Sequence, residues 1–175
     1  MKELEQMIIG SCFGEDQYRQ ISFLEANDFT NYPEKPFREF WKLLEINKAY
    51  DLTLMKVLSK CQDQHLKNLL MLNCDVVAAA NLHRYALCLL ETRFKALLIT
   101  LLVNLSNDSK NALEVELLSH CQVAVIKEDL FDLSDNLIEY LGSQASEGTK
   151  RRINDFLKYR DRRVNEAKKV INELN

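Results

Sequence analysis

One stretch of the chain constrains its fold more than any other: residues 79–105, AANLHRYALCLLETRFKALLITLLVNL. In its last 21 residues only Glu91, Arg93 and Lys95 are charged. A membrane-spanning helix needs about 20 consecutive apolar residues, and the two basic residues leave an apolar run of only 96–103. The stretch therefore predicts a helix that is buried against protein, and it excludes a membrane span.

The apolar side chains of this predicted helix cannot all share one face, because Leu97, Leu98, Leu101 and Leu102 point in several directions around a helix. A return helix over 111–127, joined by a short turn, forms an antiparallel hairpin that covers only part of this surface. We expect the N-terminal helices or a second copy of the chain to cover the remainder. The second possibility predicts a homodimer or higher oligomer whose interface contains Tyr85, Leu89, Phe94, Leu97, Leu101, Leu117 and Cys121.

The remaining sequence is also typical of helices, since two prolines and four glycines in 175 residues are too few for a fold with many turns. We predict an all-α fold with a globular head of about six helices, an antiparallel helical hairpin and a C-terminal amphipathic basic helix. The second half of the hairpin continues helically towards Gly142, with a break near Glu128 and Asp129. The predicted boundaries are 1–75 for the head, 76–127 for the hairpin, 128–148 for a linker-like helix and loop, and 149–175 for the basic helix.

The cysteines and the first residues bear on localisation. The five cysteines are odd in number and form no C-x-x-C pair, which is typical of a reduced protein rather than a disulfide scaffold. Charges on both sides of the short apolar run near residue 8 argue against a signal peptide. We therefore expect a cytoplasmic protein that does not associate with a membrane.

Charge is distributed unevenly along the chain. Residues 1–149 carry a net charge of −8, whereas residues 150–175 carry +5. Near-heptad apolar positions from Ile153 onward predict an amphipathic helix, with Arg160 in one position of the apolar seam. This helix either binds nucleic acid, with Phe156 and Tyr159 stacking on bases, or has a charged face that is simply solvated, or docks on the acidic body of the chain or on a partner helix. The candidate nucleic-acid contacts are Lys150, Arg151, Arg152, Lys158, Arg160, Arg162 and Arg163.

The sequence offers little catalytic chemistry. No phosphate-binding loop is present, and none of the common hydrolase or metalloprotease motifs occurs. Cys61 and His65 have a spacing that suits one metal ion, but His120 and Cys121, as adjacent residues on a helix, point about 100° apart and can hardly complete the site. We expect no catalytic residue, no metal and no cofactor, and therefore a protein that is not an enzyme.

Four segments, in this order, resemble the N-terminal domain of DnaB-type replicative DNA helicases. They are LEQMIIGSCFGEDQ, LEANDFTNYPEKPFREFWKLLE, AYDLTLMKVLSK and AAANLHRYALCLLETRFKALL. The resemblance rests on Glu5, Ile8, Ile9 and Gly10, then Asp28, Phe29 and Phe37, then Asp51, Thr53 and Leu54, and finally Ala80, Asn81, Tyr85, Ala86 and Arg93. It covers about residues 3–127, and the related helicase-binding domain at the C-terminus of bacterial primase fits the last segment less well.

The resemblance implies a helical head followed by a hairpin that mediates dimerisation and contacts primase. After Gly142 the family continues into an ATPase motor with a phosphate loop, whereas this sequence has a basic segment there. Helicase activity is therefore not implied. We expect a non-enzymatic DNA-replication protein that oligomerises and binds a helicase, its loader or a primase. The alternative is a nucleic-acid-binding replication protein that uses the basic C-terminal helix on a dimeric helical head.

Overall fold

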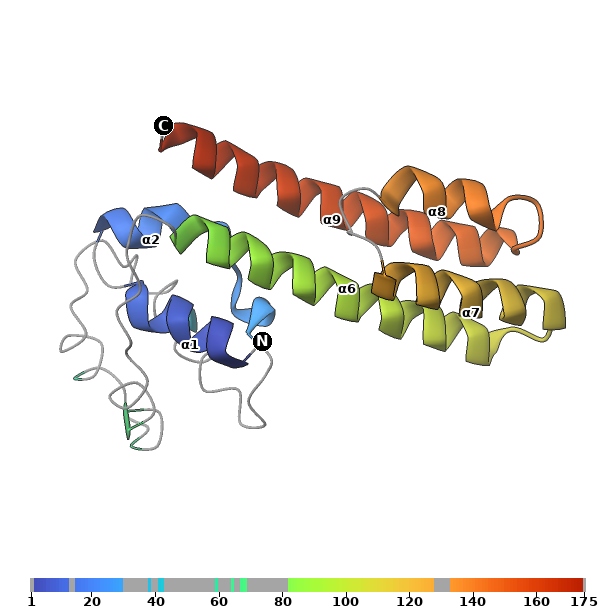
Figure 1. Ribbon diagram of the computed structural model, residues 1–175, viewed down its shortest axis with the longest axis horizontal. Helices are drawn as coiled ribbons and strands as arrows, with labels where there is room; N and C mark the ends of the chain where they lie inside the picture. Colours follow the sequence, from blue (N-terminus) through green and yellow to red (C-terminus); the bar gives the residue numbers. More distant parts are fainter. Residues whose placement is uncertain are drawn as a thin grey trace. The chain divides into compact units, whose positions relative to one another are not determined.

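The computed structural model describes residues 2–12, 15–29, 82–127 and 133–174, together with residues 38, 41, 42, 59, 64, 67 and 68. All regular secondary structure in these residues is helical (Figure 1), which confirms the predicted all-α class. Between residues 30 and 81, which include much of the predicted head, only these seven positions are described. The number of helices in the head therefore stays a prediction.

The elements are α1 (Lys2–Ser11), α2 (Glu15–Ile21), the short 3-10 helix η1 (Ala26–Asp28), α6 (Leu82–Asp108), α7 (Ala112–Lys127), α8 (Leu133–Leu141) and α9 (Glu147–Glu173). The chain divides into two compact units, one of residues 1–90 and 166–175 and the other of residues 91–165. The two long helices, α6 and α9, each contribute residues to both units.

In the first unit, apolar side chains gather around a buried tryptophan. The indole of Trp41 is fully buried and donates a hydrogen bond of 3.0 Å to the carbonyl oxygen of Leu24. Its ring lies 5.0 Å from the ring of Phe29, and Ile8 and Ile9 of α1 are also buried. A tryptophan that satisfies its N–H in this way contributes a large apolar surface without leaving a polar group unpaired.

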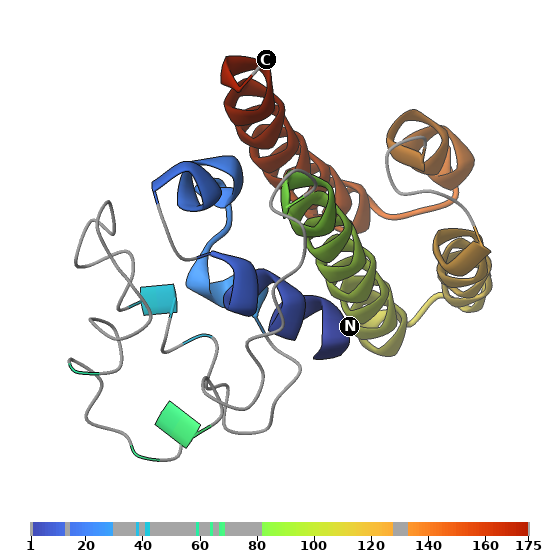
Figure 2. The ribbon, with the colours of Figure 1, turned by 60° about the vertical axis from the view of Figure 1, so that its left-hand side comes forward.

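The second unit is a bundle whose helices alternate in direction along the chain. Residues 91–108 of α6 run one way, α7 returns beside them, α8 reverses again, and the first half of α9 returns (Figure 1). Figure 2 shows α6 and α9 on one side of this bundle and α7 and α8 on the other. The break predicted near Glu128 and Asp129 lies outside the described residues, between the end of α7 at Lys127 and the start of α8 at Leu133. Short connections between antiparallel neighbours are typical of up-down-up-down helix bundles.

Helix α9 covers a face of α6 that the return helix α7 was expected to leave uncovered. The ring of Phe94 meets the rings of Phe156 and Tyr159 edge-on, at centroid distances of 6.3 and 5.9 Å. The α6 residues Leu98 and Leu102 are buried along the same line as Phe94. In the second unit the cover thus comes from the basic C-terminal helix, in agreement with the expectation that this helix docks on the body of the chain.

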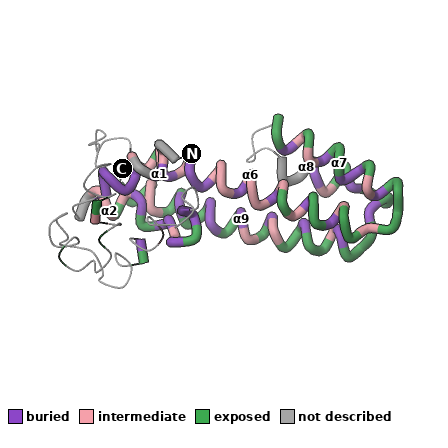
Figure 3. The backbone as a smooth tube through the Cα atoms, turned by 90° about the horizontal axis from the view of Figure 1, so that it is seen from below, coloured by how far each residue is buried: buried purple, intermediate pink, exposed green. Residues whose placement is uncertain are grey.

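The apolar seam predicted for α9 is confirmed, and it includes a charged residue. Ile153, Leu157 and Val164 are buried, and Arg160, in the predicted seam position, is only 3% exposed. In Figure 3 buried and exposed residues alternate along α9, as expected for an amphipathic helix.

The described helices can be compared with the length and apolar character of a membrane-spanning helix. None of the helices there combines the length and the apolar character that crossing a membrane requires. The cytoplasmic localisation stays a prediction.

Candidate interaction surfaces

The residues predicted for the hairpin interface fall into two groups. Four are buried within the chain itself, so they belong to its own core in this structure: Leu89, Phe94, Leu117 and Cys121. The other three, Tyr85, Leu97 and Leu101, are half-buried and retain surface that a partner could contact. Leu97 and Leu101 are therefore partly core and partly surface.

Helix α7 has an exposed apolar face that the sequence analysis did not select. Val123 is 48% exposed and Ile126 is 64% exposed, and the half-buried Val115 lies on the same side of the helix. Ser119, which is exposed, occupies the turn between them. We call these four residues the outer face of α7. Its signal in the sequence is the spacing of Val115, Ser119, Val123 and Ile126 at steps of three and four, which marks one helical side.

The basic residues of α9 are not equally available. Arg151, Arg152, Lys158 and Arg162 are exposed, although Arg152 pairs with Asp108 at 3.4 Å, and Lys150 is half-buried and pairs with Glu147 at 2.9 Å. Arg160 and Arg163, in contrast, are 3% and 0% exposed. A phosphate group cannot reach buried guanidinium groups, so the nucleic-acid candidates reduce to the residues on the outer side of the helix.

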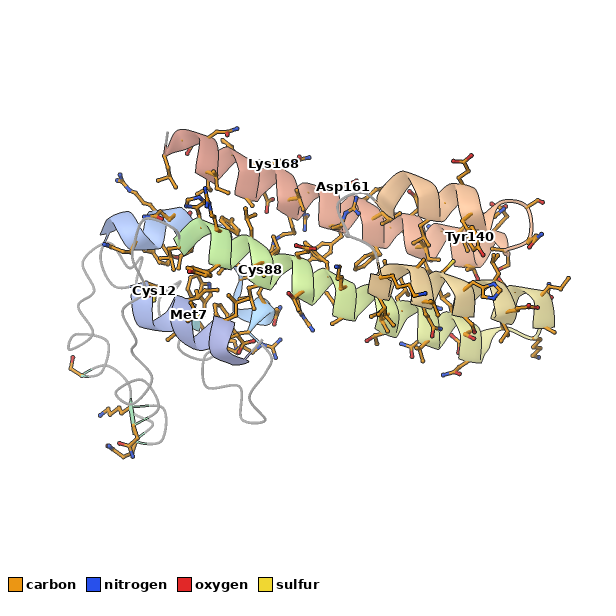
Figure 4. The ribbon with its side chains drawn as sticks, in the orientation of Figure 1. Met7, Cys12, Cys88, Tyr140, Asp161 and Lys168 are labelled. Atoms are coloured by element: carbon orange, nitrogen blue, oxygen red, sulfur yellow. The ribbon has the colours of Figure 1, made fainter. Side chains whose placement is uncertain are left out.

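The two buried arginines have partners inside the chain. Arg160 donates from Nε and Nη2 to the carboxylate of Asp161, and the Nε contact measures 3.0 Å (Asp161 is labelled in Figure 4). Arg163 donates from Nη1 to the hydroxyl oxygen of Tyr159 at 3.2 Å. Burial of a charged side chain is costly unless it is hydrogen-bonded, and these contacts account for part of the compensation.

The aromatic residues predicted to stack on bases have a structural role instead. Phe156 and Tyr159 both pack edge-on against Phe94, and the guanidinium carbon of Arg162 lies 5.5 Å above the ring of Tyr159. These rings are therefore engaged with protein groups on the inner side of α9. Because both rings are half-buried in this packing, a base could reach only the part of each ring that stays exposed.

A buried carboxylate joins the two connections at one end of the bundle. The oxygen Oε2 of Glu114 accepts a 2.6 Å hydrogen bond from the hydroxyl of Ser109, which precedes α7. The oxygen Oε1 accepts a 2.8 Å hydrogen bond from the backbone N–H of Ser146, which precedes α9. Glu114 is 5% exposed. One side chain thus fixes the α6–α7 connection to the α8–α9 connection.

The same two connections supply helix caps. The Asn111 side chain accepts from the N–H of Leu113 at 3.0 Å, and the Ser146 hydroxyl accepts from the N–H of Thr149 at 3.2 Å. Glu114 occupies the third position of α7, where a capping-box glutamate would normally bond to the N–H of its own N-cap residue. Here it bonds to the N-cap residue of α9, so the N-terminal ends of both helices share one negative charge.

These hydrogen bonds control the ionisation of Glu114. They lower its pKa from 4.5 to about 2, with the hydroxyl of Ser109 as the largest cause, followed by the hydroxyl of Thr149 and the backbone N–H of Ser146. Burial acts in the opposite direction, because desolvation disfavours the charged form. The side chain is therefore a carboxylate at neutral pH.

Two hollows lie at this end of the bundle. One of about 480 Å³ is lined by Glu114 and its partners together with Asp108 and Lys110. The other, of about 400 Å³, lies between α7 and α8 and is lined by Leu117, Leu141 and the exposed Tyr140, which Figure 4 labels. In the first hollow the protein itself provides an anion, because the Glu114 carboxylate accepts the hydrogen bonds that Ser109 and Ser146 donate.

His120 and Cys121, which as adjacent residues of α7 were expected to point in different directions, differ in their exposure. His120 is exposed, whereas Cys121 is fully buried and burial raises the pKa of its thiol to about 11. Cys61 and His65 lie outside the described residues. Within the described part of the chain, no three histidine, cysteine, aspartate or glutamate side chains come together in a way that could hold a metal ion.

Comparison of the chain with protein-family models, with curated proteins and with solved structures finds no match. The assignment of function therefore depends on the surfaces described above and on the residues that carry the sequence resemblance.

Proposed function

We propose that this chain is a non-enzymatic, self-associating protein of DNA replication that binds a replicative helicase, its loader or a primase. The sequence resemblance over residues 3–127 supports the assignment to replication. Its last segment, which includes Tyr85, Ala86 and Arg93, leads into a long helix, α6, that is followed after three residues by the antiparallel α7. This arrangement is compatible with the hairpin that the resemblance implies.

The observation that carries the proposal is the outer face of α7. A helix of a bundle normally turns its apolar side inward and its polar side to water, but α7 exposes Val123 and Ile126 as well as burying Leu118 and Val125. Exposed apolar side chains that lie together mark a surface for another protein. We therefore assign protein binding to α7.

The sequence of α7 suits a second copy of the same helix. In an antiparallel pair that crosses near the middle of α7, Val115 of each copy faces Ile126 of the other. Glu116 of each copy then approaches Lys127 of the other, and both of these residues are exposed in the single chain. A two-fold interface requires such self-complementarity, because the same patch contributes both sides.

The double substitution Val123→Glu and Ile126→Glu is expected to abolish the complex with the host's hexameric replicative helicase or primase. The two glutamates would place charges within the apolar contact between α7 and its partner. The measurement is size-exclusion chromatography of the purified chain mixed with each partner, in which the intact chain co-elutes and the variant elutes alone.

The matched control is Leu113→Glu with His120→Glu, which also adds two glutamates to exposed positions of α7 but on another side of the helix. This control is expected to retain the complex. Loss of the complex in both variants, or its absence with the intact chain for every partner, would contradict the proposed function.

A further inference from the structure

We propose that the outer side of the first half of α9 binds the phosphate groups of a nucleic-acid backbone. The surface consists of Arg151, Arg152, Lys158 and Arg162, all exposed, and we call it the cationic face of α9. This inference does not depend on the proposed role of α7, because the two surfaces lie on different helices and share no residue.

Helical geometry places three of these cations on one line. Lys158 follows Arg151 by seven residues and Arg162 follows Lys158 by four, so their directions differ by about 20° and 40° at about 100° per residue. At about 1.5 Å per residue the line is roughly 16 Å long. One strand of B-form DNA presents a phosphate about every 3.4 Å along its axis, so roughly five phosphates span that length.

The charge of the second unit favours an anionic polymer at this helix and nowhere else in the unit. Residues 147–165 contain seven basic and three acidic residues, a net charge of +4, whereas residues 91–146 contain four basic and nine acidic residues, a net charge of −5. A long anion is therefore attracted to α9 and repelled by the remainder of the unit.

Hydrogen bonds from basic side chains within the chain offset part of the negative charge on this side of α9. Asp161, the acidic residue between Lys158 and Arg162, accepts hydrogen bonds from the buried Arg160. Its charge is thus balanced from within the chain, and the exposed Glu147 pairs with Lys150 at 2.9 Å, whereas Asp155 is a further exposed acidic residue in this half of the helix. Three of the four exposed cations are arginines, whose guanidinium group can donate two parallel hydrogen bonds to one phosphate.

The binding is expected to be independent of sequence. Base recognition needs groups that reach base edges or rings that stack on bases, and Phe156 and Tyr159 are both packed against Phe94. The cationic face therefore contacts phosphates alone. Single-stranded and duplex DNA of unrelated sequence should bind with similar affinity.

The test is fluorescence anisotropy of the full chain with a fluorescein-labelled 20-base-pair duplex, titrated at several potassium chloride concentrations. Four phosphate contacts predict a slope of about −3.6 for the logarithm of affinity against the logarithm of salt, which weakens binding roughly 100-fold between 50 and 200 mM. The triple variant Arg151→Gln, Lys158→Gln and Arg162→Gln should have a shallower slope, about −1, because one contact remains. The single variant Arg162→Gln should reduce the magnitude of the slope by about 0.9. This variant provides the test if the triple variant does not fold.

The control removes the same charge elsewhere. Arg19→Gln, Arg84→Gln and Lys110→Gln lie outside α9 at exposed positions, and this variant should bind the duplex within about twofold of the original chain. Equal weakening in both triple variants would show that net charge alone is responsible and would overturn the proposal. The absence of binding at 50 mM salt would also overturn it. Equally effective competition by polyglutamate would assign the surface to an acidic protein instead.

Discussion

Replacement of Phe94 by alanine is expected to lower the free energy of unfolding by about 3–5 kcal/mol. The side chain is 1% exposed and contacts the rings of Phe156 and Tyr159. Its removal leaves a cavity between α6 and α9 and ends two edge-on aromatic contacts. Urea denaturation followed by circular dichroism at 222 nm measures the change.

The control for Phe94 is Thr100→Ala on the same helix. Thr100 is exposed, and its hydroxyl donates to the carbonyl oxygen of Ala96 within α6, so the substitution should change stability by less than about 0.5 kcal/mol. A Phe94→Ala variant as stable as the Thr100→Ala variant would show that α9 does not pack on α6 in solution.

The second large effect is expected for Glu114→Gln. The shift of the Glu114 pKa from 4.5 to about 2 corresponds to about 3 kcal/mol of stability at neutral pH, at roughly 1.4 kcal/mol per unit. Glutamine removes the charge that the hydroxyls of Ser109 and Thr149 and the N–H of Ser146 stabilise. The measurement is again the free energy of unfolding at pH 7, with Glu116→Gln, an exposed neighbour on α7, as the control that should change it little.

The pH dependence of this difference has a definite sign. Because the pKa of Glu114 is lower in the folded than in the unfolded chain, its contribution is fully present above pH 4.5 and is lost as the pH falls towards 2. The difference in stability between the original chain and Glu114→Gln should therefore be constant from pH 7 to about pH 5 and shrink below that. A difference that persists unchanged at pH 2.5 would contradict the assigned hydrogen bonds.

Several features could be predicted from sequence because they depend on local patterns. The scarcity of proline and glycine predicted the all-α class, and the apolar spacing in α9 identified Ile153 and Leu157 as buried together with Arg160. Helical periodicity shows which residues share a side of a helix, and this information was enough for these features.

The remaining features depend on contacts between segments far apart in the chain. Periodicity does not show which helix lies against α6, so the sequence predicted that α9 docks on protein without identifying the face that it covers, and Leu89 was assigned to an interface between copies. The pattern Asn111 to Glu114 is typical of a helix start, but the partner of Glu114 across the bundle, Ser146, is 32 residues away. Local sequence gives no indication of such a pairing.

Burial also separates arginines that look equivalent in the sequence. Arg160, Arg162 and Arg163 belong to one basic run, yet only Arg162 faces outward. The apolar residues three or four positions away determine which of these arginines is buried, because they define the side of α9 that faces the core. The exposed apolar face of α7 was overlooked for the same reason, since Val123 and Val125 differ only in the side of the helix that they occupy.

Sedimentation equilibrium of the intact chain at micromolar concentration tests most directly whether α7 is a protein-binding surface. The expected result is a dimer, and a monomer with an unchanged circular dichroism spectrum for Val123→Glu with Ile126→Glu. A monomeric intact chain would contradict the assignment, and so would a variant that remains dimeric.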